Sequence, residues 1–262
     1  MTGPTDISLP PELASFTVKI PLSTWGQPFR SAASMSPSKP KPSLPAAEVP
    51  VPKAVVSRLS LYLRELQHLV RDGHQRTSSS QLGRLLGFSD AQVRKDLAYF
   101  GHFGHPGIGY RCDDLIKAVR KILGTDRDWP VAMVGTGNLG RALLGYKGFS
   151  HQGFRIVAAF DIDPGRVGAT IEGVRVFHLD RLAEVAAENK IKLGMIAVPA
   201  PAAQSVADRL VAAGIEGIVN FAPVTISLPD GVRQVGVDLA IELEQLSFSV
   251  VNRANADGTA EV

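Results

Sequence analysis

The sequence predicts an α/β protein in which a doubly wound parallel sheet follows a small helical domain. Three observations predict this architecture. Short apolar runs alternate with amphipathic helical patterns after residue 130, a turn with three glycines joins the first run to a helix, and residues 53–124 carry closely spaced helical patterns. At 262 residues the chain is long enough for two domains with cores of their own.

Charge divides the chain into two contrasting segments. Residues 53–124 hold twelve Lys or Arg against six Asp or Glu, whereas residues 125–262 hold twelve against sixteen. A basic segment joined to an acidic one suggests that only the first meets a polyanion such as nucleic acid.

Composition also excludes several classes of protein. The one cysteine, Cys112, cannot form an internal disulfide, and its neighbours supply no catalytic constellation, so we expect an inert thiol rather than a nucleophile. The chain has no apolar run as long as a membrane span, and its start lacks the basic-then-apolar order of a signal peptide. We therefore expect a cytoplasmic protein with no membrane partner.

Residues 1–52 form a proline-rich segment without hydrophobic periodicity. They hold eleven of the eighteen prolines, including the run PSKPKPSLPAAEVPVP. Such a composition does not bury an apolar core, so we expect a disordered or extended tail. Lys39 and Lys41 can add weak attraction to nucleic acid, although a solvated linker is the more ordinary interpretation.

Helical patterns spaced as in a helix-turn-helix follow the tail. The first helix is expected over Val55–Arg71, with apolar side chains on one face. After the capping residues Thr77–Ser80, a short helix ends at Gly87. The next begins at Ser89, which with Gln92 forms a capping box. The apolar positions of the first two helices are Val55, Leu59, Leu63, Leu66, Val70, Leu82, Leu85 and Leu86.

The helix after Ser89 has an apolar stripe and a polar outer face. Val93, Leu97 and Phe100 mark the stripe. Side chains outside it can donate hydrogen bonds to base edges and phosphates in a major groove. A solvated face is the alternative, but the spacing and the basic charge favour DNA. The predicted DNA-binding residues on this helix are Gln92, Arg94, Lys95 and Tyr99.

Residues 101–111, GHFGHPGIGYR, form a glycine-rich segment after that helix. They predict a hairpin, or wing, of the kind that lies against the backbone or minor groove of DNA. A further helix is expected over Asp113–Leu123 and a domain linker over residues 124–130. The basic groups of the wing are Arg111, which we assign to DNA binding, His102 and His105.

The stretch Val131–Leu144, VAMVGTGNLGRALL, carries a dinucleotide fingerprint between a strand and a helix. Gly135 allows the tight turn, Gly137 lets a pyrophosphate approach the backbone, and Gly140 lets the helix pack close to the sheet. The helix start favours the anion. The predicted cofactor-binding residues here are Gly135, Thr136, Gly137, Asn138, Leu139 and Gly140.

Asp161 supplies the second half of this fingerprint. It follows the short apolar strand Arg155–Phe160, at the distance from the glycines that the fingerprint requires. Its carboxylate can accept hydrogen bonds from the adenosine ribose, and the next residue is Ile162 rather than an arginine, which favours NAD over NADP. A glycine turn and a strand-end aspartate without any ligand are the alternative.

Strands and helices alternate through the rest of this Rossmann-type domain. Two strand ends, at Val198 with Pro199 and at Asn220 with Phe221, lie where such sheets bind ligands, and we expect them to line the nicotinamide half of the site. The other expected elements are strands at Leu193–Val198, Gly217–Phe221 and Arg233–Val237, and helices at Leu182–Glu188 and Ala202–Ala213.

Asp238–Val251, DLAIELEQLSFSVV, predicts an amphipathic helix after the sheet. It packs either on its own domain or against a second subunit, and the sequence favours neither. The expected domains are a proline-rich tail (residues 1–52), a winged helix-turn-helix (residues 53–124), a Rossmann domain (residues 125–237), a dimerisation helix (residues 238–252) and a flexible tail (residues 253–262).

The chain resembles the Rex family of redox-sensing transcriptional repressors over residues 55–252. The matching blocks are RTSSSQLGRLLGFSDAQVRKDLAYFG, GIGY, VGTGNLGRALL, AFDIDP, VPAPAAQ, NFAP and VDLAIELEQLSF. The resemblance implies a homodimer that binds a palindromic operator through its winged helix-turn-helix domains and binds NADH or NAD+, as a ligand that does not react, in its Rossmann domains. It also implies a C-terminal helix swapped between subunits.

The resemblance further implies how the chain works. The repressor would bind the operator when it is free or NAD+-bound. NADH would rotate its DNA-binding domains so that they no longer match the two half-sites, and the operator would be released. Arg94 and Lys95 would read bases, Tyr146 would lie near the nicotinamide, and Arg64, Tyr146 and Asp238 would form a polar switch, with structural surface roles as the alternative. The chain departs from the family in its N-terminal extension and in Pro106, where a basic residue is usual in the wing.

Two other functions compete with this interpretation. A small NAD-dependent dehydrogenase needs a positioned acid or base, yet the region after Trp129 offers only His151 and His178, and Tyr146 and Lys147 would point apart on a helix. A CoA- or nucleotide-binding module that serves another protein would leave the helix-turn-helix without purpose. We therefore predict no catalytic residue and no metal site.

Overall fold

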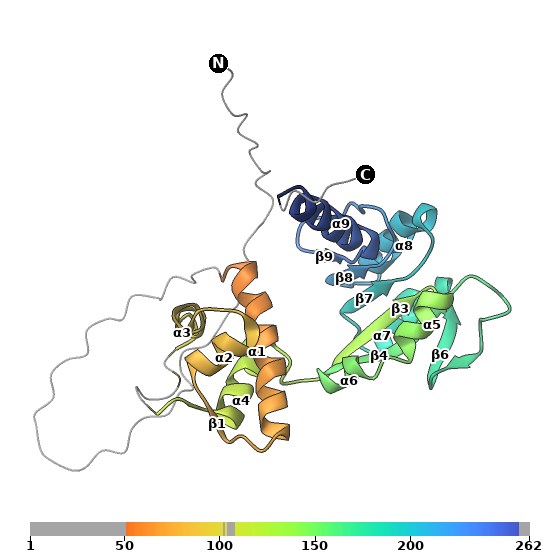
Figure 1. Cartoon of the computed structure of the whole chain (residues 1–262). Helices are drawn as coiled ribbons and strands as arrows, with labels where there is room; N and C mark the ends of the chain where they lie inside the picture. The colour runs from red at the N-terminus through yellow and green to blue at the C-terminus, as the bar shows by residue number, and fades with distance from the viewer. Residues whose placement is uncertain (1–50, 102, 104–107, 257–262) are drawn as a thin grey trace, which may run out of the picture. The chain divides into compact units, whose positions relative to one another are not determined.

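The structure is a computed structural model that describes residues 51–101, 103 and 108–256 (Figure 1). The chain divides into two compact units between Asp126 and Arg127, here called the N-terminal unit and the sheet unit, and each is described by itself. Outside the described residues lie His102, His105 and Pro106 of the expected wing, all of the expected tail but its last two residues, and residues 257–262.

The N-terminal unit contains the predicted helix-turn-helix. Its helices are α1 (Lys53–Arg71), α2 (Ser79–Leu86), α3 (Asp90–Ala98) and α4 (Cys112–Leu123). Ser78 and Ser89 begin α2 and α3 by accepting hydrogen bonds from the backbone amides of Gln81 and Gln92, each at 3.1 Å. Gly87, at φ +74°, ends α2 in the left-handed conformation that a side chain would disfavour.

The core of this unit shows where the predicted stripe of α1 was wrong. Val70 is exposed, whereas Tyr62 and Leu69 are buried. The buried positions advance in steps of four and three residues, and this mean period of about 3.5 keeps one face inward, while the predicted stripe drifts off it. Leu85 of α2 is also exposed. The buried core residues are Leu59, Tyr62, Leu63, Leu66, Leu69, Leu82, Val93, Leu97, Cys112, Leu115 and Val119.

The strand after α3 has a more distant partner than a local hairpin. β2 (Tyr110–Arg111) pairs antiparallel with β1 (Arg76–Thr77), which precedes α2. Gly109 allows this approach, because a Cβ at its φ of +74° would meet the carbonyl oxygen of Thr77. β2 therefore closes a two-stranded sheet on the segment in front of the helix-turn-helix, while most of the expected hairpin of residues 101–111 lies outside the described residues.

The sheet unit holds the predicted doubly wound sheet, in the strand order β5-β6-β4-β3-β7-β8-β9. All neighbouring strands are parallel except β5, which is antiparallel to β6. From β3 the chain continues to β4 and β6 on one side, then returns to β7 on the other side of β3. The strand order therefore reverses between β3 and β7, and their carboxyl ends form a topological switch point. The strands are β3 (Trp129–Val134), β4 (Phe154–Asp161), β5 (Thr170–Ile171), β6 (Val174–His178), β7 (Leu193–Ile196), β8 (Gly217–Asn220) and β9 (Arg233–Gly236).

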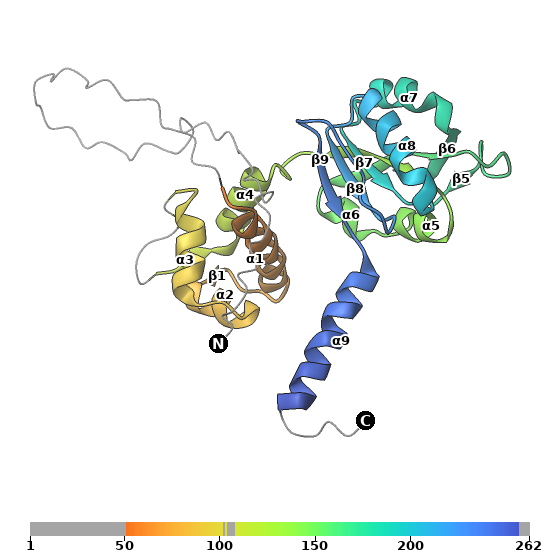
Figure 2. The ribbon, with the colours of Figure 1, turned by 90° about the horizontal axis from the view of Figure 1, so that it is seen from above.

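Helices cover both faces of this sheet (Figure 2). Ala132 and Val134 of β3 pack in one core with side chains of α7 and α8, whereas Val131 and Met133 pack in the other with side chains of α5 and α6. This alternation follows from the two-residue period of a strand. The helices are α5 (Asn138–Leu144), α6 (Gly148–His151), the short 3-10 helix η2 (Leu179–Arg181), α7 (Leu182–Glu188) and α8 (Ala200–Ala212).

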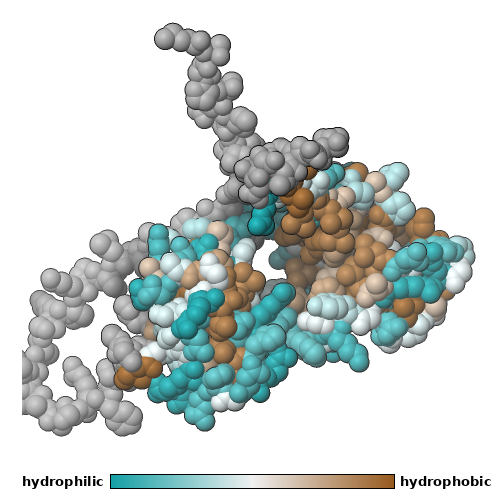
Figure 3. Space-filling model, viewed as in Figure 1, coloured by the Kyte–Doolittle hydropathy of each residue, from teal (hydrophilic) through white to brown (hydrophobic). Residues whose placement is uncertain are grey.

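The last helix, α9 (Leu239–Ala256), extends away from the sheet (Figure 2). Every side chain from Leu239 to Arg253 is exposed, so the alternative that packed this helix on its own domain is wrong for the single chain. Figure 3 shows hydrophobic side chains of this helix gathered at the surface. Along the described ranges, no helix combines the length and the apolar character needed to cross a membrane.

Candidate functional site

The three glycines of the turn between β3 and α5 have different surroundings. A Cβ on Gly135, at φ +95°, would meet the carbonyl oxygen of Ala197, and one on Gly140 would meet the carbonyl oxygen of Gly135. A Cβ on Gly137 would have Arg166 Nη1, at 4.0 Å, as its nearest neighbour. The first and third glycines thus let backbone segments touch, while the second leaves open space in front of the turn.

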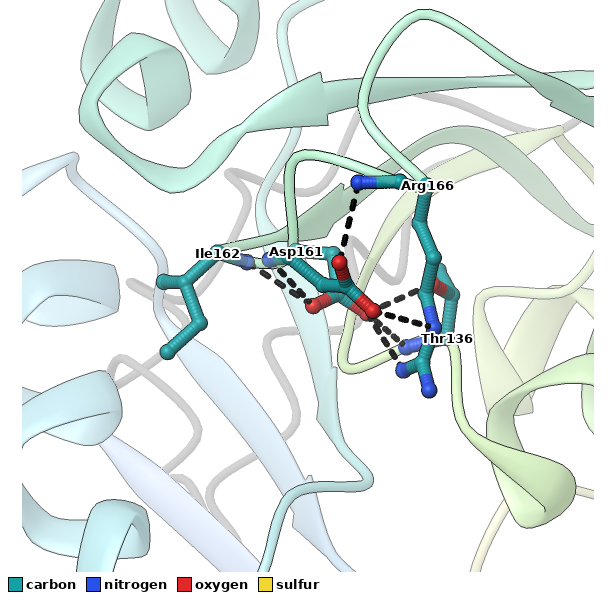
Figure 4. A network of polar contacts seen from close by, with 6 residues as sticks. Thr136, Asp161, Ile162 and Arg166 are labelled. Carbon is teal, nitrogen blue, oxygen red and sulfur yellow. Dashed lines mark hydrogen bonds and ion pairs between the residues drawn. The ribbon is translucent and has the colours of Figure 1, made fainter.

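Asp161, at the end of β4, is tied to this turn by its side chain (Figure 4). Its Oδ2 accepts hydrogen bonds from the Thr136 amide at 2.8 Å and the Thr136 hydroxyl at 2.5 Å, and Arg166 Nη1 lies 3.2 Å away. Its Oδ1 accepts from the amides of Ile162 and Asp163, at 2.8 and 3.0 Å. Burial raises the pKa of Asp161, but these hydrogen bonds outweigh burial and lower the pKa to about 2.

The side chain beside the Asp161 carboxylate is not the one from which NAD was favoured over NADP. Ile162 was expected there, yet Figure 4 shows the Ile162 side chain turned away while Arg166 reaches toward Asp161. Arg166 also pairs with Asp163 at 3.2 Å. An arginine therefore does lie beside the glycine turn. The sequence signal that could have found it is the turn at Asp163, whose carboxylate accepts from the Gly165 amide and meets Arg166 three residues on.

The predicted residues after β7 and at the end of β8 differ in the groups that they can present to a ligand. Val198 lies beside the glycine turn, because a Cβ on Gly135 would approach its Cγ1 to 2.9 Å, and Pro199 begins α8. The Asn220 amide instead binds its own turn: it donates to the Val224 carbonyl at 2.8 Å and accepts from the Ala222 amide at 3.0 Å.

A groove of about 520 Å³ opens where β8 and β9 end and α9 begins. Asn220 and Asp238 both line it, so the structure brings these two predicted residues to one place. Phe221, next to Asn220, packs partly buried in the core that contains α5 and α6.

Tyr146 lies between α5 and α6, with its ring against the ring of Phe149 at a centroid distance of 5.0 Å. A Cβ on Gly148 would meet the outer end of the Tyr146 ring, so the ring lies directly over that glycine. Residues 145–147 lie outside the helices, and both Tyr146 and Lys147 line one cavity of about 200 Å³. The helical spacing from which these two side chains were expected to point apart is therefore absent at residues 145–147.

The predicted DNA-binding side chains stand on the outer face of α3 or beside it. Lys95 and Tyr99 are exposed. Arg94 Nη1 binds Asp90 at 2.7 Å and the Ser79 hydroxyl at 3.3 Å. Arg111, in β2, is exposed and lies 3.4 Å from Asp114.

Asp96 is the residue of α3 that the sequence interpretation missed. It is fully buried, yet it accepts hydrogen bonds from Arg58 at 2.6 and 2.8 Å, from Tyr62 at 2.7 Å and from Gln92 at 2.7 Å. Burial raises its pKa, but these donors outweigh burial and lower it. Arg64, the arginine of α1 that was predicted to act as a switch, is exposed. The signal for Asp96 was its place on the apolar side of α3, between Val93 and Leu97.

Comparison with known proteins assigns both units. A family described as "Putative DNA-binding protein N-terminus" matches residues 50–98, and one described as "CoA binding domain" matches residues 126–224. The redox-sensing transcriptional repressor Rex of Desulfitobacterium hafniense is 50% identical over 203 residues, which cover 78% of this chain and 97% of that protein. The Rex repressor of Streptomyces griseus is 44% identical over 211 residues, 80% of this chain and 83% of that one.

Solved structures give the same result. RSP, a Rex-family repressor, in complex with β-NAD+ and operator DNA, matches with a TM-score of 0.75 and 36% identity over 81% of this chain and all of that chain. RSP in complex with β-NADH matches with a TM-score of 0.72 and 35% identity over 79% of this chain and 98% of that chain. The fold, the glycine turn and these relatives together show that the chain belongs to the Rex family of redox-sensing transcriptional repressors.

Proposed function

We propose that this chain represses transcription as a homodimer that binds a palindromic operator when free or NAD+-bound and releases it when NADH binds. The observation that carries the proposal is the presence, in one chain, of a helix-turn-helix whose second helix exposes Arg94 and Lys95 and of an open glycine turn at the switch point of a parallel sheet. Its relatives are named repressors, and the structures of RSP contain NAD+ with operator DNA or NADH.

The DNA-binding half rests on the outer face of α3. Arg94 and Lys95 supply donors for guanine edges or phosphates, and Gln92 lies in the first turn of the helix, where base contacts of such helices concentrate. Tyr99 and Arg111 would add contacts to the sugar-phosphate backbone. Asp90 holds Arg94 through Nη1, so the other guanidinium donors can contact DNA.

The dinucleotide-binding half rests on the turn after β3. Open space at Gly137 and the neighbouring Arg166 suit an anionic pyrophosphate, and Asp161 holds Thr136 in place. Asn138, Leu139, Val198 and Pro199 would line the path of the ligand. When bound, the dinucleotide supplies a pyrophosphate, ribose hydroxyls and a nicotinamide ring that is positively charged only in its oxidised form.

Release by NADH requires a difference in free energy between two states of the dimer. The residues around Tyr146 and the strand ends at Val198 and Asn220 would contact the reduced ring better in the released state. A differential of about 3 kcal/mol would shift the equilibrium by roughly two orders of magnitude. Linkage makes the effect reciprocal, so operator DNA should weaken NADH binding by the same factor.

A second copy of the chain is the proposed partner of α9. Apolar side chains are exposed on every side of α9. A monomer rarely exposes so extended an apolar surface. Exchange of α9 between subunits would cover them and place Asp238 at the interface, where a polar switch with Tyr146 and Arg64 is expected. The proposed role excludes catalysis, and a cytoplasmic location agrees with DNA as the partner.

Fluorescence anisotropy of a labelled operator tests this proposal. The operator is selected from random duplexes by the protein, then titrated with NADH and separately with NAD+. We expect release by NADH at a concentration at least tenfold lower than by NAD+. Equal release by both, or binding indifferent to both, would contradict redox sensing, and turnover of NADH with a carbonyl substrate would support the dehydrogenase instead.

A further inference from the structure

Asp96 and Gln92 lie one helical turn apart on α3 and are joined by a hydrogen bond. Gln92 Nε2 donates to Asp96 Oδ1 at 2.7 Å. The same carboxylate is held from α1 by Arg58, through Nε at 2.6 Å and Nη2 at 2.8 Å, and by the Tyr62 hydroxyl at 2.7 Å. Asp96 is fully buried, so its position is fixed by these partners and by the packing around them.

The chemistry of this contact fixes the orientation of the Gln92 amide. A carboxylate only accepts hydrogen bonds, so the Gln92 NH₂ group has to face Asp96 and the carbonyl oxygen Oε1 has to face away. Among the described residues, none donates a hydrogen bond to that oxygen. The Gln92 backbone amide is in turn held by Ser89 at 3.1 Å, and the side chain is partly exposed.

We propose that Gln92 reads the operator through its carbonyl oxygen, which accepts a hydrogen bond from an exocyclic amino group in the major groove, and that Asp96 is the positioning residue. In the major groove such amino groups are N6 of adenine and N4 of cytosine. Guanine and thymine carry hydrogen-bond acceptors in those places, and an acceptor cannot form a hydrogen bond with the Gln92 carbonyl oxygen. This inference rests on the proposed function, because it requires α3 to lie in the major groove.

The hydrogen bonds from α1 to Asp96 fix the orientation of the Gln92 amide. A free glutamine amide can rotate by half a turn and accept or donate equally well, so it discriminates poorly between bases. Here rotation would set the carbonyl oxygen against the Asp96 carboxylate, and Arg58 and Tyr62 prevent that carboxylate from moving aside. Preorganisation of this kind raises specificity without adding a contact.

Operators that lack one amino group at a time test the inference. Purine replaces each adenine, and 2-pyrimidinone replaces each cytosine, in the duplex that the full chain selects. Kd is measured by anisotropy for the wild type, for Gln92→Met, which keeps the length of the side chain without its amide, and for Gln75→Met, an exposed control outside α3.

We expect one position per half-site at which loss of the amino group weakens wild-type and Gln75→Met binding about tenfold but leaves Gln92→Met unaffected. The base replaced at that position distinguishes adenine from cytosine. Wild-type binding that is indifferent to every deletion, or Gln92→Met binding as sensitive as the wild type, would overturn the inference alone. Failure to select any duplex would instead contradict the proposed function.

Asp96→Asn provides a second, independent readout. Without the carboxylate the Gln92 amide is free to rotate. We therefore expect the ratio of the Kd values without and with the amino group at that position to fall toward one, while the Kd for an unrelated duplex is unchanged. Circular dichroism at the assay temperature establishes that the variant is folded. Discrimination retained in the folded variant would show that Asp96 does not position Gln92.

Discussion

Arg166 Nη1 lies 3.2 Å from Asp161 Oδ2, the oxygen that also accepts hydrogen bonds from the backbone and the hydroxyl of Thr136. One carboxylate thereby shapes the glycine turn and holds a cation at its edge. The guanidinium is 4.0 Å from the place where a Cβ of Gly137 would stand. The guanidinium therefore borders the open space in front of the glycine turn, where it is paired with the carboxylates of Asp161 and Asp163.

We expect Arg166→Met to weaken the binding of NADH and NAD+ by about tenfold each, because both carry the same pyrophosphate and a charge-assisted hydrogen bond contributes about that much. Intrinsic NADH fluorescence and calorimetry measure the two affinities. Arg181→Met is the matched control, since Arg181 pairs with Glu184 on the surface. A change in only one of the two affinities would place Arg166 near the nicotinamide instead.

Gly137→Val and Gly140→Val should separate ligand binding from folding. The space at Gly137 is open, so that variant should fold and bind operator but lose its response to NADH. At Gly140 the new side chain would collide with the Gly135 carbonyl, so we expect a lower melting temperature. Thermal melts and NADH titrations on both variants check this contrast. An NADH titration like that of the wild type in Gly137→Val would contradict the fingerprint assignment.

Arg94→Ala combined with Lys95→Ala should abolish operator binding and leave NADH affinity unchanged, because both side chains are exposed and belong to the N-terminal unit. The remaining binding to random duplex should show a shallower dependence on salt, as two phosphate or base contacts are lost. Operator affinity retained in the double variant would remove α3 from the interface.

Asp96→Ala should destabilise the N-terminal unit by about 3 kcal/mol, since it leaves the Arg58 guanidinium and the Tyr62 hydroxyl without their shared partner. Urea unfolding followed by circular dichroism measures the loss. Asp90→Ala is the control: it removes an exposed ion pair with Arg94 and should leave the midpoint nearly unchanged. Equal midpoints for the two variants would show that the buried network contributes nothing.

Acid should destabilise the sheet unit through Asp161. Its pKa is lowered from 3.8 to about 2, so its charged form stabilises the folded state by about 2 kcal/mol above pH 4, and this contribution is lost as the pH falls through 2. Unfolding free energies between pH 2 and 5 should therefore fall more steeply for the wild type than for Asp161→Asn. Parallel curves would mean that Asp161 has the same pKa in the unfolded chain.

The helix starts at Ser78 and Ser89 and the turn at Gly135 were predictable because each depends on residues within a few positions. The buried contacts were not. Asp96 and its partner Arg58 are 38 residues apart in the sequence. The local pattern of α1 does not indicate that Arg58, rather than Arg64, contacts a buried carboxylate. For Arg166 the turn at Asp163 is a local signal, but its contact with Asp161 depends on the direction that the chain takes after that turn.

Short elements with weak patterns were missed for a related reason. β5 has two residues and β6 has five, and their pairing with each other and with β4 decides that they are strands. Tyr146 and Lys147 were compared with the spacing of a helix, although α5 ends at Leu144. Their shared cavity follows from the packing of Phe149 and the close approach at Gly148.

The uncovered apolar side chains of α9 have a consequence for regulation. If a second copy covers them, as proposed, then the fraction of chains competent to repress depends on how many chains the cell contains. Growth that dilutes the protein would relieve repression at constant NADH. The operator would then respond to the abundance of its repressor as well as to the redox state, and the two inputs would multiply.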